Sequence, residues 1–260
     1  MDSPSPTPAR QSSSGARMRD FPGYLRSLFF TDLLIYLYTA VCGTFSVCGS
    51  FFDAHGRWQH GCARVWSRLI LKTSRIHLSV EGIENVGPDR PVIFCSNHPS
   101  AMDIPILFVS LPEQFRFLAK RSLFHVPFLG WHLRRSGHIP VERGRPREAL
   151  KGFEQAAKRI QEGRPVVVFP EGSRSRTGKT LPFKNGTFYL AVLSGVPVVP
   201  ITLVGSREVL EPDSYHIRPG RVRVIIHKAI PTAGLTIHDV GDLSRRVRER
   251  IVSGLETARD

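Results

Sequence analysis

Two short segments of this sequence carry side chains suited to chemistry. The first, residues 97–103, reads Asn-His-Pro-Ser-Ala-Met-Asp, and the second, residues 169–174, reads Phe-Pro-Glu-Gly-Ser-Arg. Each follows a short apolar run that is typical of a buried strand. In sheets flanked by helices, ligands bind beyond the carboxyl ends of the strands. The pattern therefore predicts that both segments contribute to one site.

His98 and Asp103 are the residue types of a general base and its orienting carboxylate. A neutral imidazole can take the proton of a hydroxyl group as that oxygen attacks a carbonyl carbon, while a carboxylate on the other ring nitrogen fixes the tautomer. Four intervening residues, including Pro99, let the chain turn so that the two side chains can meet. The structural alternative makes His98 an ordinary strand-end residue and Asp103 the cap of a short helix over residues 104–109.

Four motifs, taken in order, resemble those of the glycerolipid acyltransferase family, and specifically its 1-acylglycerol-3-phosphate acyltransferases. The first is the pair His98 and Asp103 with four residues between them. The others are residues 137–143 (Gly-His-Ile-Pro-Val-Glu-Arg), 169–175 (Phe-Pro-Glu-Gly-Ser-Arg-Ser) and 196–201 (Val-Pro-Val-Val-Pro-Ile). One such motif can arise by chance, but four in this order rarely do.

The resemblance implies an enzyme that transfers a fatty acyl group from an acyl thioester, acyl-CoA or acyl carrier protein, to the free hydroxyl of lysophosphatidate (1-acylglycerol 3-phosphate). Phosphatidic acid would be the product, and His98 would act as base without an acyl-enzyme. No cofactor besides the acyl donor is expected. Other acceptors stay open at this point: glycerol 3-phosphate, a lysophospholipid or an amino-acid lysolipid.

The resemblance also assigns substrate-binding residues. Lys120 and Arg143 match positions that the family uses for the acceptor phosphate, and Arg174 joins them from the third motif. A guanidinium can hold a phosphate through two parallel hydrogen bonds. Glu171 is expected to bind the acceptor or to order the site, with a glycerol hydroxyl or Arg174 as its partner. Gly172 allows close approach of the backbone, and its amide is expected to help stabilise the oxyanion.

The net charge of +14 favours anionic partners, namely membrane lipids and a phosphate-bearing substrate. Residues 116–151 hold nine basic residues and two acidic ones, so this region is expected to face phosphate. A basic protein that binds membrane or nucleic acid without catalysis is an alternative, but the motifs favour the enzyme and no nucleic-acid partner. A lipid hydrolase would need a Gly-x-Ser-x-Gly elbow, which the sequence lacks.

Neither ATP nor a structural metal is expected. Residues 172–180 resemble a P-loop, but five residues separate the two glycines where that loop has four, and Pro182 follows where a helix should begin. The four cysteines form no Cys-x-x-Cys pair and no zinc-ligand spacing, and they indicate a reducing compartment: Cys42, Cys48, Cys62 and Cys95.

An uncharged run of 20 residues, 33–52, is long enough to cross a hydrocarbon core of about 30 Å as a helix. Arginines precede it and a basic domain follows it, so the positive-inside rule favours the cytoplasm for both flanks, and a dipping hairpin competes with a single span. Residues 57–72 then form a basic amphipathic pattern that suits either the headgroup layer or packing on the core. Its expected apolar face comprises Trp58, Cys62, Val65, Trp66, Leu69 and Ile70. We expect a membrane protein whose active site faces the cytoplasm.

Beyond residue 74 the pattern predicts an α/β fold with a mixed, largely parallel sheet flanked by helices. Of the 260 residues, 41% are hydrophobic, which is enough for one substantial core. The chain divides into a disordered basic tail (1–20), N-terminal hydrophobic, membrane-associated helices (21–74) and a catalytic domain (75–260). Strands are expected at 76–81, 92–96, 115–119, 138–141, 166–169, 198–204 and 222–227, and helices at 146–162, 184–194 and 240–256.

Overall fold

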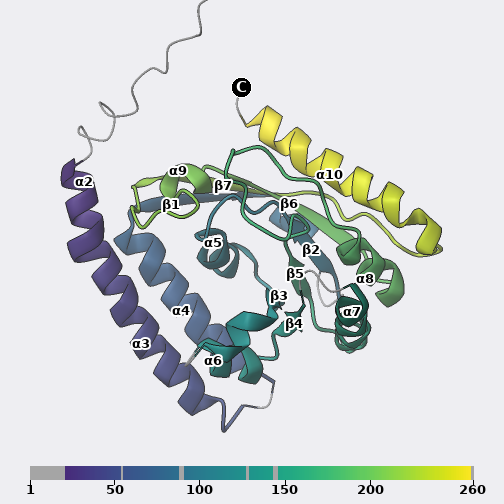
Figure 1. Ribbon diagram of the computed structural model, residues 1–260, viewed down its shortest axis with the longest axis horizontal. Helices are drawn as coiled ribbons and strands as arrows, with labels where there is room; N and C mark the ends of the chain where they lie inside the picture. The colour runs from purple at the N-terminus through teal and green to yellow at the C-terminus, as the bar shows by residue number, and fades with distance from the viewer. Residues whose placement is uncertain (1–20, 54, 88–90, 127–128, 143–145, 259–260) are drawn as a thin grey trace, which may run out of the picture.

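A seven-stranded sheet lies at the centre of the molecule (Figure 1). The structure is a computed structural model that describes residues 21–53, 55–87, 91–126, 129–142 and 146–258, so the expected tail (1–20) lies outside the described residues. The strand order is β1-β7-β6-β2-β5-β3-β4, and only the pair β6 and β7 is antiparallel. The strands are β1 (Ile76–Glu81), β2 (Ile93–Ser96), β3 (Arg116–Lys120), β4 (Ile139–Val141), β5 (Val166–Val168), β6 (Val198–Val204) and β7 (Gly220–Ile226).

Helices cover both faces of this sheet. One face packs on α4 (Arg57–Thr73) and α5 (Asp103–Ser110), and the other packs on α7 (Pro146–Gln161), α8 (Gly186–Ser194) and α10 (Val240–Thr257). Side chains alternate along the central strand β2, because Phe94 enters the first core while Ile93 and Cys95 enter the second. Shorter helices connect the strands: η2 (Ile83–Asn85), η3 (Arg121–His125), α6 (Leu129–Arg135) and α9 (Ser206–Val209). A further short helix, η4 (Ile237–Asp239), follows β7 and leads into α10.

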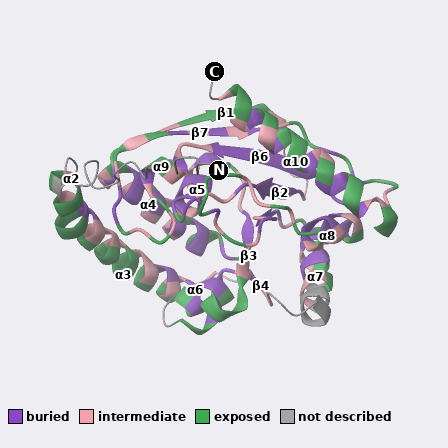
Figure 2. Cartoon of the chain, turned by 45° about the horizontal axis from the view of Figure 1, so that its top comes forward, coloured by how far each residue is buried: buried purple, intermediate pink, exposed green. Residues whose placement is uncertain are grey.

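The N-terminal region forms one long helix on the outside of the molecule, built from α2 (Phe21–Arg26), the π-helical η1 (Ser27–Thr31) and α3 (Asp32–Gly49). Figure 2 shows its mostly exposed outer surface. Its inner surface packs on α4, where the Trp66 indole N–H donates to the Thr39 hydroxyl at 3.0 Å. Because α4 in turn contributes Ala63, Ile70 and Leu71 to the main core, these helices share a core with the sheet.

The predicted fold class is confirmed, and each predicted strand is present with its ends within two residues. The apolar helix extends beyond the uncharged run 33–52, since it begins at Phe21 and includes Asp32. The apolar stripe expected on α4 is not its buried face: Trp58 and Val65 are about half exposed, while Gln59, His60 and Ser67 are buried.

Candidate active site

The sheet brings the two motif segments together because β2 and β5 are neighbours. Cys95 near the end of β2 pairs with Val168 at the end of β5, and both chains leave the sheet at the same edge. The Asn97 side chain then extends the pairing to β6, because its amide nitrogen donates to the Leu203 carbonyl at 3.0 Å and its oxygen accepts from the Leu203 N–H at 2.8 Å. The first motif is therefore anchored on both sides.

His98 and Asp103 form the predicted pair. The Nδ1 atom of His98 lies 2.7 Å from Oδ2 of Asp103, and the carboxylate, which is fully buried, also accepts the N–H of Ser100 at 2.9 Å. A carboxylate only accepts hydrogen bonds, so Nδ1 carries a proton, and in the neutral ring Nε2 keeps its lone pair. Asp103 is the first residue of α5 and not the cap that precedes it.

Phe169 holds the imidazole ring from one side. The two rings stack with centroids 3.9 Å apart and planes inclined by 16°. Together with the Asp103 hydrogen bond, this contact restricts the rotation of His98. The sequence placed Phe169 in a motif, but nothing in its spacing indicated that it would pack on the histidine.

Glu171 joins the two motif loops through their backbones. One carboxylate oxygen accepts the N–H of His98 at 2.9 Å, and the other accepts the N–H of Leu181 at 2.8 Å. Burial raises the pKa of Glu171, while the backbone N–H donors counteract part of this shift. The two hydrogen bonds fit the expected role of ordering the site, and an interaction of Glu171 with the acceptor stays a prediction.

Gly172 forms a tight turn after β5. It adopts φ +73°, which favours glycine, and its N–H donates to the Phe169 carbonyl at 3.0 Å. The amide is therefore used within the turn and is not directed at an oxyanion. A Cβ atom at this position would lie 2.8 Å from the Lys184 amine, so the glycine leaves room for that side chain.

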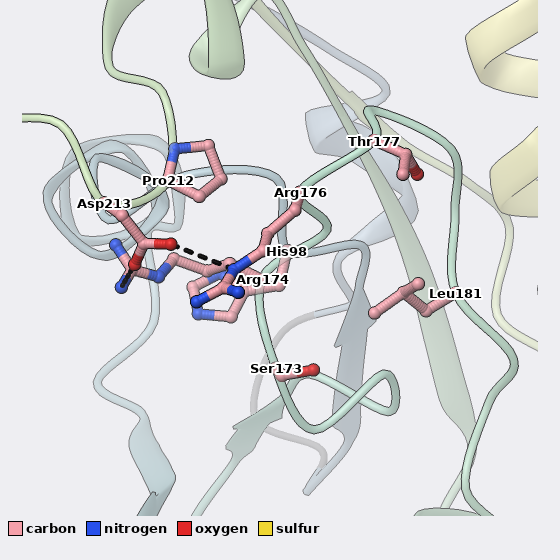
Figure 3. A pocket seen from close by; sticks show the side chains of 8 residues that line it. All are labelled: His98, Ser173, Arg174, Arg176, Thr177, Leu181, Pro212 and Asp213. Carbon is pink, nitrogen blue, oxygen red and sulfur yellow. Dashed lines mark ion pairs between the residues drawn. The ribbon is translucent and has the colours of Figure 1, made fainter.

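A cavity of about 560 Å³ lies beside His98 (Figure 3). Two arginines, Arg174 and Arg176, line it together with Asp213. The Asp213 carboxylate lies 3.0 Å from Nε of Arg176 and 3.8 Å from the Arg174 guanidinium. The remaining lining residues are Ser173, Thr177, Leu181 and Pro212. The arrangement places a base next to a cationic wall, which suits a hydroxyl substrate that carries an anionic group.

Of the other two predicted phosphate ligands, the structure describes only Lys120. Lys120 is exposed at the end of β3 and is not among the residues that line the cavity. Arg143 lies outside the described residues. Arg176 and Asp213 were missed by the sequence analysis, although the repeated arginines after Gly172 were a usable signal for the first. Within the described part of the chain, no group of three or more His, Cys, Asp or Glu side chains is arranged to hold a metal ion.

The fold and the site are similar to those of acyltransferases. Residues 77–204 match the family model described as Acyltransferase. The chain is 32% identical over 240 residues to the 1-acyl-sn-glycerol-3-phosphate acyltransferase of Saccharomyces cerevisiae, covering 90% of this chain and 77% of the yeast protein. The chain belongs to the 1-acyl-sn-glycerol-3-phosphate acyltransferase family.

Two further relatives agree with this assignment. The chain is 37% identical over 182 residues to a chloroplast 1-acyl-sn-glycerol-3-phosphate acyltransferase of Brassica napus, covering 69% of this chain and 52% of that protein. The chain therefore spans about half the length of the plant relative. The crystal structure of the 1-acyl-sn-glycerophosphate acyltransferase from Thermotoga maritima superposes with a TM-score of 0.76 at 26% identity, covering 94% of this chain and 97% of that one.

Proposed function

We propose that this chain transfers a fatty acyl group from an acyl thioester, acyl-CoA or acyl carrier protein, to the free hydroxyl of lysophosphatidate, with phosphatidic acid as the product. The observation that carries the proposal is the 2.7 Å contact between His98 and Asp103 beside a cavity lined by Arg174 and Arg176. The names of the yeast and Brassica napus relatives support the same acceptor.

In this proposal His98 acts as the general base. Because its Nδ1–H is donated to Asp103, Nε2 takes the proton of the acceptor hydroxyl while that oxygen attacks the thioester carbonyl carbon. The tetrahedral intermediate then collapses with cleavage of the carbon–sulfur bond. The imidazolium returns its proton to the leaving thiolate, so His98 ends neutral. Asp103 stabilises the imidazolium between the two proton transfers.

Arg174 and Arg176 bind the acceptor phosphate. A phosphomonoester carries more negative charge than a zwitterionic headgroup, so two guanidiniums on one wall favour lysophosphatidate over a lysophospholipid. Arg174 is the stronger candidate for binding the phosphate, since it belongs to the third motif and its side chain is less exposed than that of Arg176. Contributions of Lys120 and Arg143 stay predictions.

A thioester-release assay with a panel of acceptors tests this function. The panel holds lysophosphatidate, glycerol 3-phosphate, lysophosphatidylcholine and a monoacylglycerol, each with acyl-CoA and with acyl carrier protein. We expect lysophosphatidate to give the highest kcat/KM. His98→Ala should lower kcat by about 10²- to 10⁴-fold, the usual contribution of a positioned base, while His77→Ala, at an exposed position on β1, should not. Wild-type turnover by folded His98→Ala protein contradicts the mechanism, and a preference for another acceptor contradicts the substrate.

The exposed apolar helix indicates membrane association, and we propose that it lies in one leaflet and does not cross the bilayer. Pro22–Gly49 is long enough to span. Its inner side, however, is hydrogen-bonded to the rest of the protein at separate points along its length. The Tyr38 hydroxyl lies 3.1 Å from the Thr73 hydroxyl, and the Ser46 hydroxyl lies 2.7 Å from Nδ1 of His132. A spanning helix would lose these contacts.

With the helix in one leaflet, both of its flanks and the active site stay on the same side of the membrane. The net charge of +14 favours the cytoplasmic leaflet, because that leaflet is anionic. We therefore propose that the active site faces the cytoplasm.

A further inference from the structure

A buried hydroxyl on a third segment contacts the carboxylate that orients His98. The Oγ atom of Ser206 lies 2.6 Å from Oδ1 of Asp103, and both residues are fully buried. The other carboxylate oxygen, Oδ2, accepts from His98 Nδ1 at 2.7 Å and from the Ser100 N–H at 2.9 Å. Because a carboxylate only accepts, the Ser206 hydroxyl must be the donor.

The local backbone explains why Ser206 reaches this position. Gly205 follows β6 with φ +86°, and a Cβ atom there would collide with the Arg221 carbonyl oxygen of β7. Only glycine fits this turn, after which α9 begins at Ser206. A second hydrogen bond holds the same segment in place, since the Ser100 hydroxyl donates to the Leu210 carbonyl at 2.7 Å. The His98–Asp103 loop is thus tied to both ends of α9.

The charge balance at Asp103 makes this hydroxyl important. Among the described residues, His98 is the only basic side chain within ion-pair distance of Asp103. A buried carboxylate is costly unless its oxygens accept hydrogen bonds. Ser206 supplies the only side-chain donor to Oδ1 within the described chain. Without it, Oδ1 would lack a side-chain partner and the carboxylate could rotate away from the imidazole.

We infer that Ser206 is a positioning residue for the acyl transfer reaction: its hydroxyl stabilises the ionised Asp103 and holds Oδ2 in line with Nδ1 of His98. This inference rests on the proposed function, in which His98 is the base. Ser206 is fully buried and is not among the residues that line the cavity, so it acts through Asp103. Its loss should therefore lower kcat and leave both KM values unchanged.

The experiment compares Ser206→Ala with the matched control Ser67→Ala. Ser67 is also fully buried, but its hydroxyl donates to the Ala63 carbonyl within α4. A hydrogen bond to a charged group corresponds to a loss of about 10- to 100-fold, so kcat of Ser206→Ala should fall by that factor. The KM values for donor and acceptor should stay within about twofold, as expected when an interaction serves mainly the transition state. Ser67→Ala should keep the wild-type kcat. Unchanged kcat in folded Ser206→Ala protein overturns the inference.

A double-mutant cycle separates positioning from general structural support. If Ser206 acts through the carboxylate, Ser206→Ala should cost little further activity in an Asp103→Asn background. Multiplicative losses would mean a role independent of Asp103 and would overturn the inference. Where Ser206→Ala fails to fold, Ser206→Cys keeps a similar shape with a weak donor, and the same loss of kcat is expected. Full activity of Ser206→Cys overturns the inference.

A spectroscopic readout keeps this test apart from the proposed function. The Nδ1 proton of His98 should give a downfield ¹H NMR resonance that is absent in His98→Ala. Ser206→Ala should shift or broaden that resonance, while Ser67→Ala should leave it in place. An unchanged resonance in Ser206→Ala overturns the inference even if no acyl transfer is found. Absence of acyl transfer by the wild-type chain with every acceptor would instead overturn the proposed function.

Discussion

At the scale of single residues, Asp213 places a negative charge where the proposed function needs a positive one. Its carboxylate pairs with Arg176 and lies 3.8 Å from Arg174, so an acceptor phosphate must displace it. Asp213→Asn removes this competition and keeps a residue that tolerates the observed φ of 63°. We expect KM for lysophosphatidate to fall severalfold with kcat unchanged, and the effect to weaken at high salt because both partners are largely exposed.

Arg174→Lys should change KM for lysophosphatidate in the opposite direction. It keeps the charge but loses the two-pronged geometry, so KM for lysophosphatidate should rise. The KM for a neutral monoacylglycerol, assayed in parallel, should change with neither substitution. An equal response of both acceptors would show that Asp213 and Arg174 support the loop and do not meet the phosphate.

At the scale of elements, the long N-terminal helix should carry the membrane contact. Phe29 and Phe30 are 69% and 58% exposed on its outer surface. The double variant Phe29→Ser/Phe30→Ser removes apolar area that would enter the leaflet, worth about 25 cal/mol per Å². The fraction that sediments with anionic vesicles should fall severalfold, whereas Ile237→Ser, an equally exposed site on η4, should have no effect. Unchanged sedimentation of the double variant would place the contact elsewhere.

The helix α4 shows how one element serves two neighbours. Its polar residues Gln59, His60 and Ser67 face the core, while Trp58 and Trp66 donate their indole N–H groups to α3. The expected apolar stripe therefore lies between α3 and solvent, and only Ile70 of that stripe is buried in the core. Because α4 contacts the core on one side and α3 on another, it has no single buried face. The spacing of its apolar residues therefore does not predict which of its residues are buried.

At the scale of the whole molecule, three histidines link stability to pH: His60 and His138 are buried, and His132 is half-buried. Burial, with nearby arginines, lowers the pKa of His60 to about 3 and that of His132 to about 4, and burial lowers the pKa of His138 well below its usual range. In the unfolded chain these groups titrate near pH 6.5. The stability that they contribute is complete above that pH. Below it only the unfolded chain binds the protons, so the free energy of unfolding falls as pH drops from about 6.5 towards 4.

His60→Phe isolates one of these groups. Among the described residues the Nε2 atom of His60 has no hydrogen-bond partner, and its ring packs near Phe108 and Phe115 with centroids 5.3 and 5.1 Å away. Phenylalanine should fit there and remove the titration. The slope of unfolding free energy against pH between 4 and 6 should decrease by up to about 1.4 kcal/mol per pH unit, measured by denaturant unfolding. Exposed His77→Phe is the control, and identical slopes for His60→Phe and wild type would contradict the linkage.

The sequence by itself was sufficient for the sheet and for the central pair. Apolar runs with β-branched residues predicted the strands, because a strand buried on both faces must be apolar throughout. The carboxyl ends of parallel strands share one edge, so the two motifs were expected to meet there. The five-residue separation of His98 and Asp103 is local, and a turn of that length lets the two side chains meet.

Only the tertiary structure decided which residues surround this pair. Ser206 is 103 residues from Asp103 along the chain, and Glu171 is 73 residues from His98. The partners of Glu171 are backbone amides, which every residue has, so no side-chain pattern could have indicated them. Asp213 enters the cavity because β6 and β7 are antiparallel and their connection passes over it. Such contacts depend on strand order and burial, which arise from the packing of the whole chain and not from the spacing of neighbouring residues.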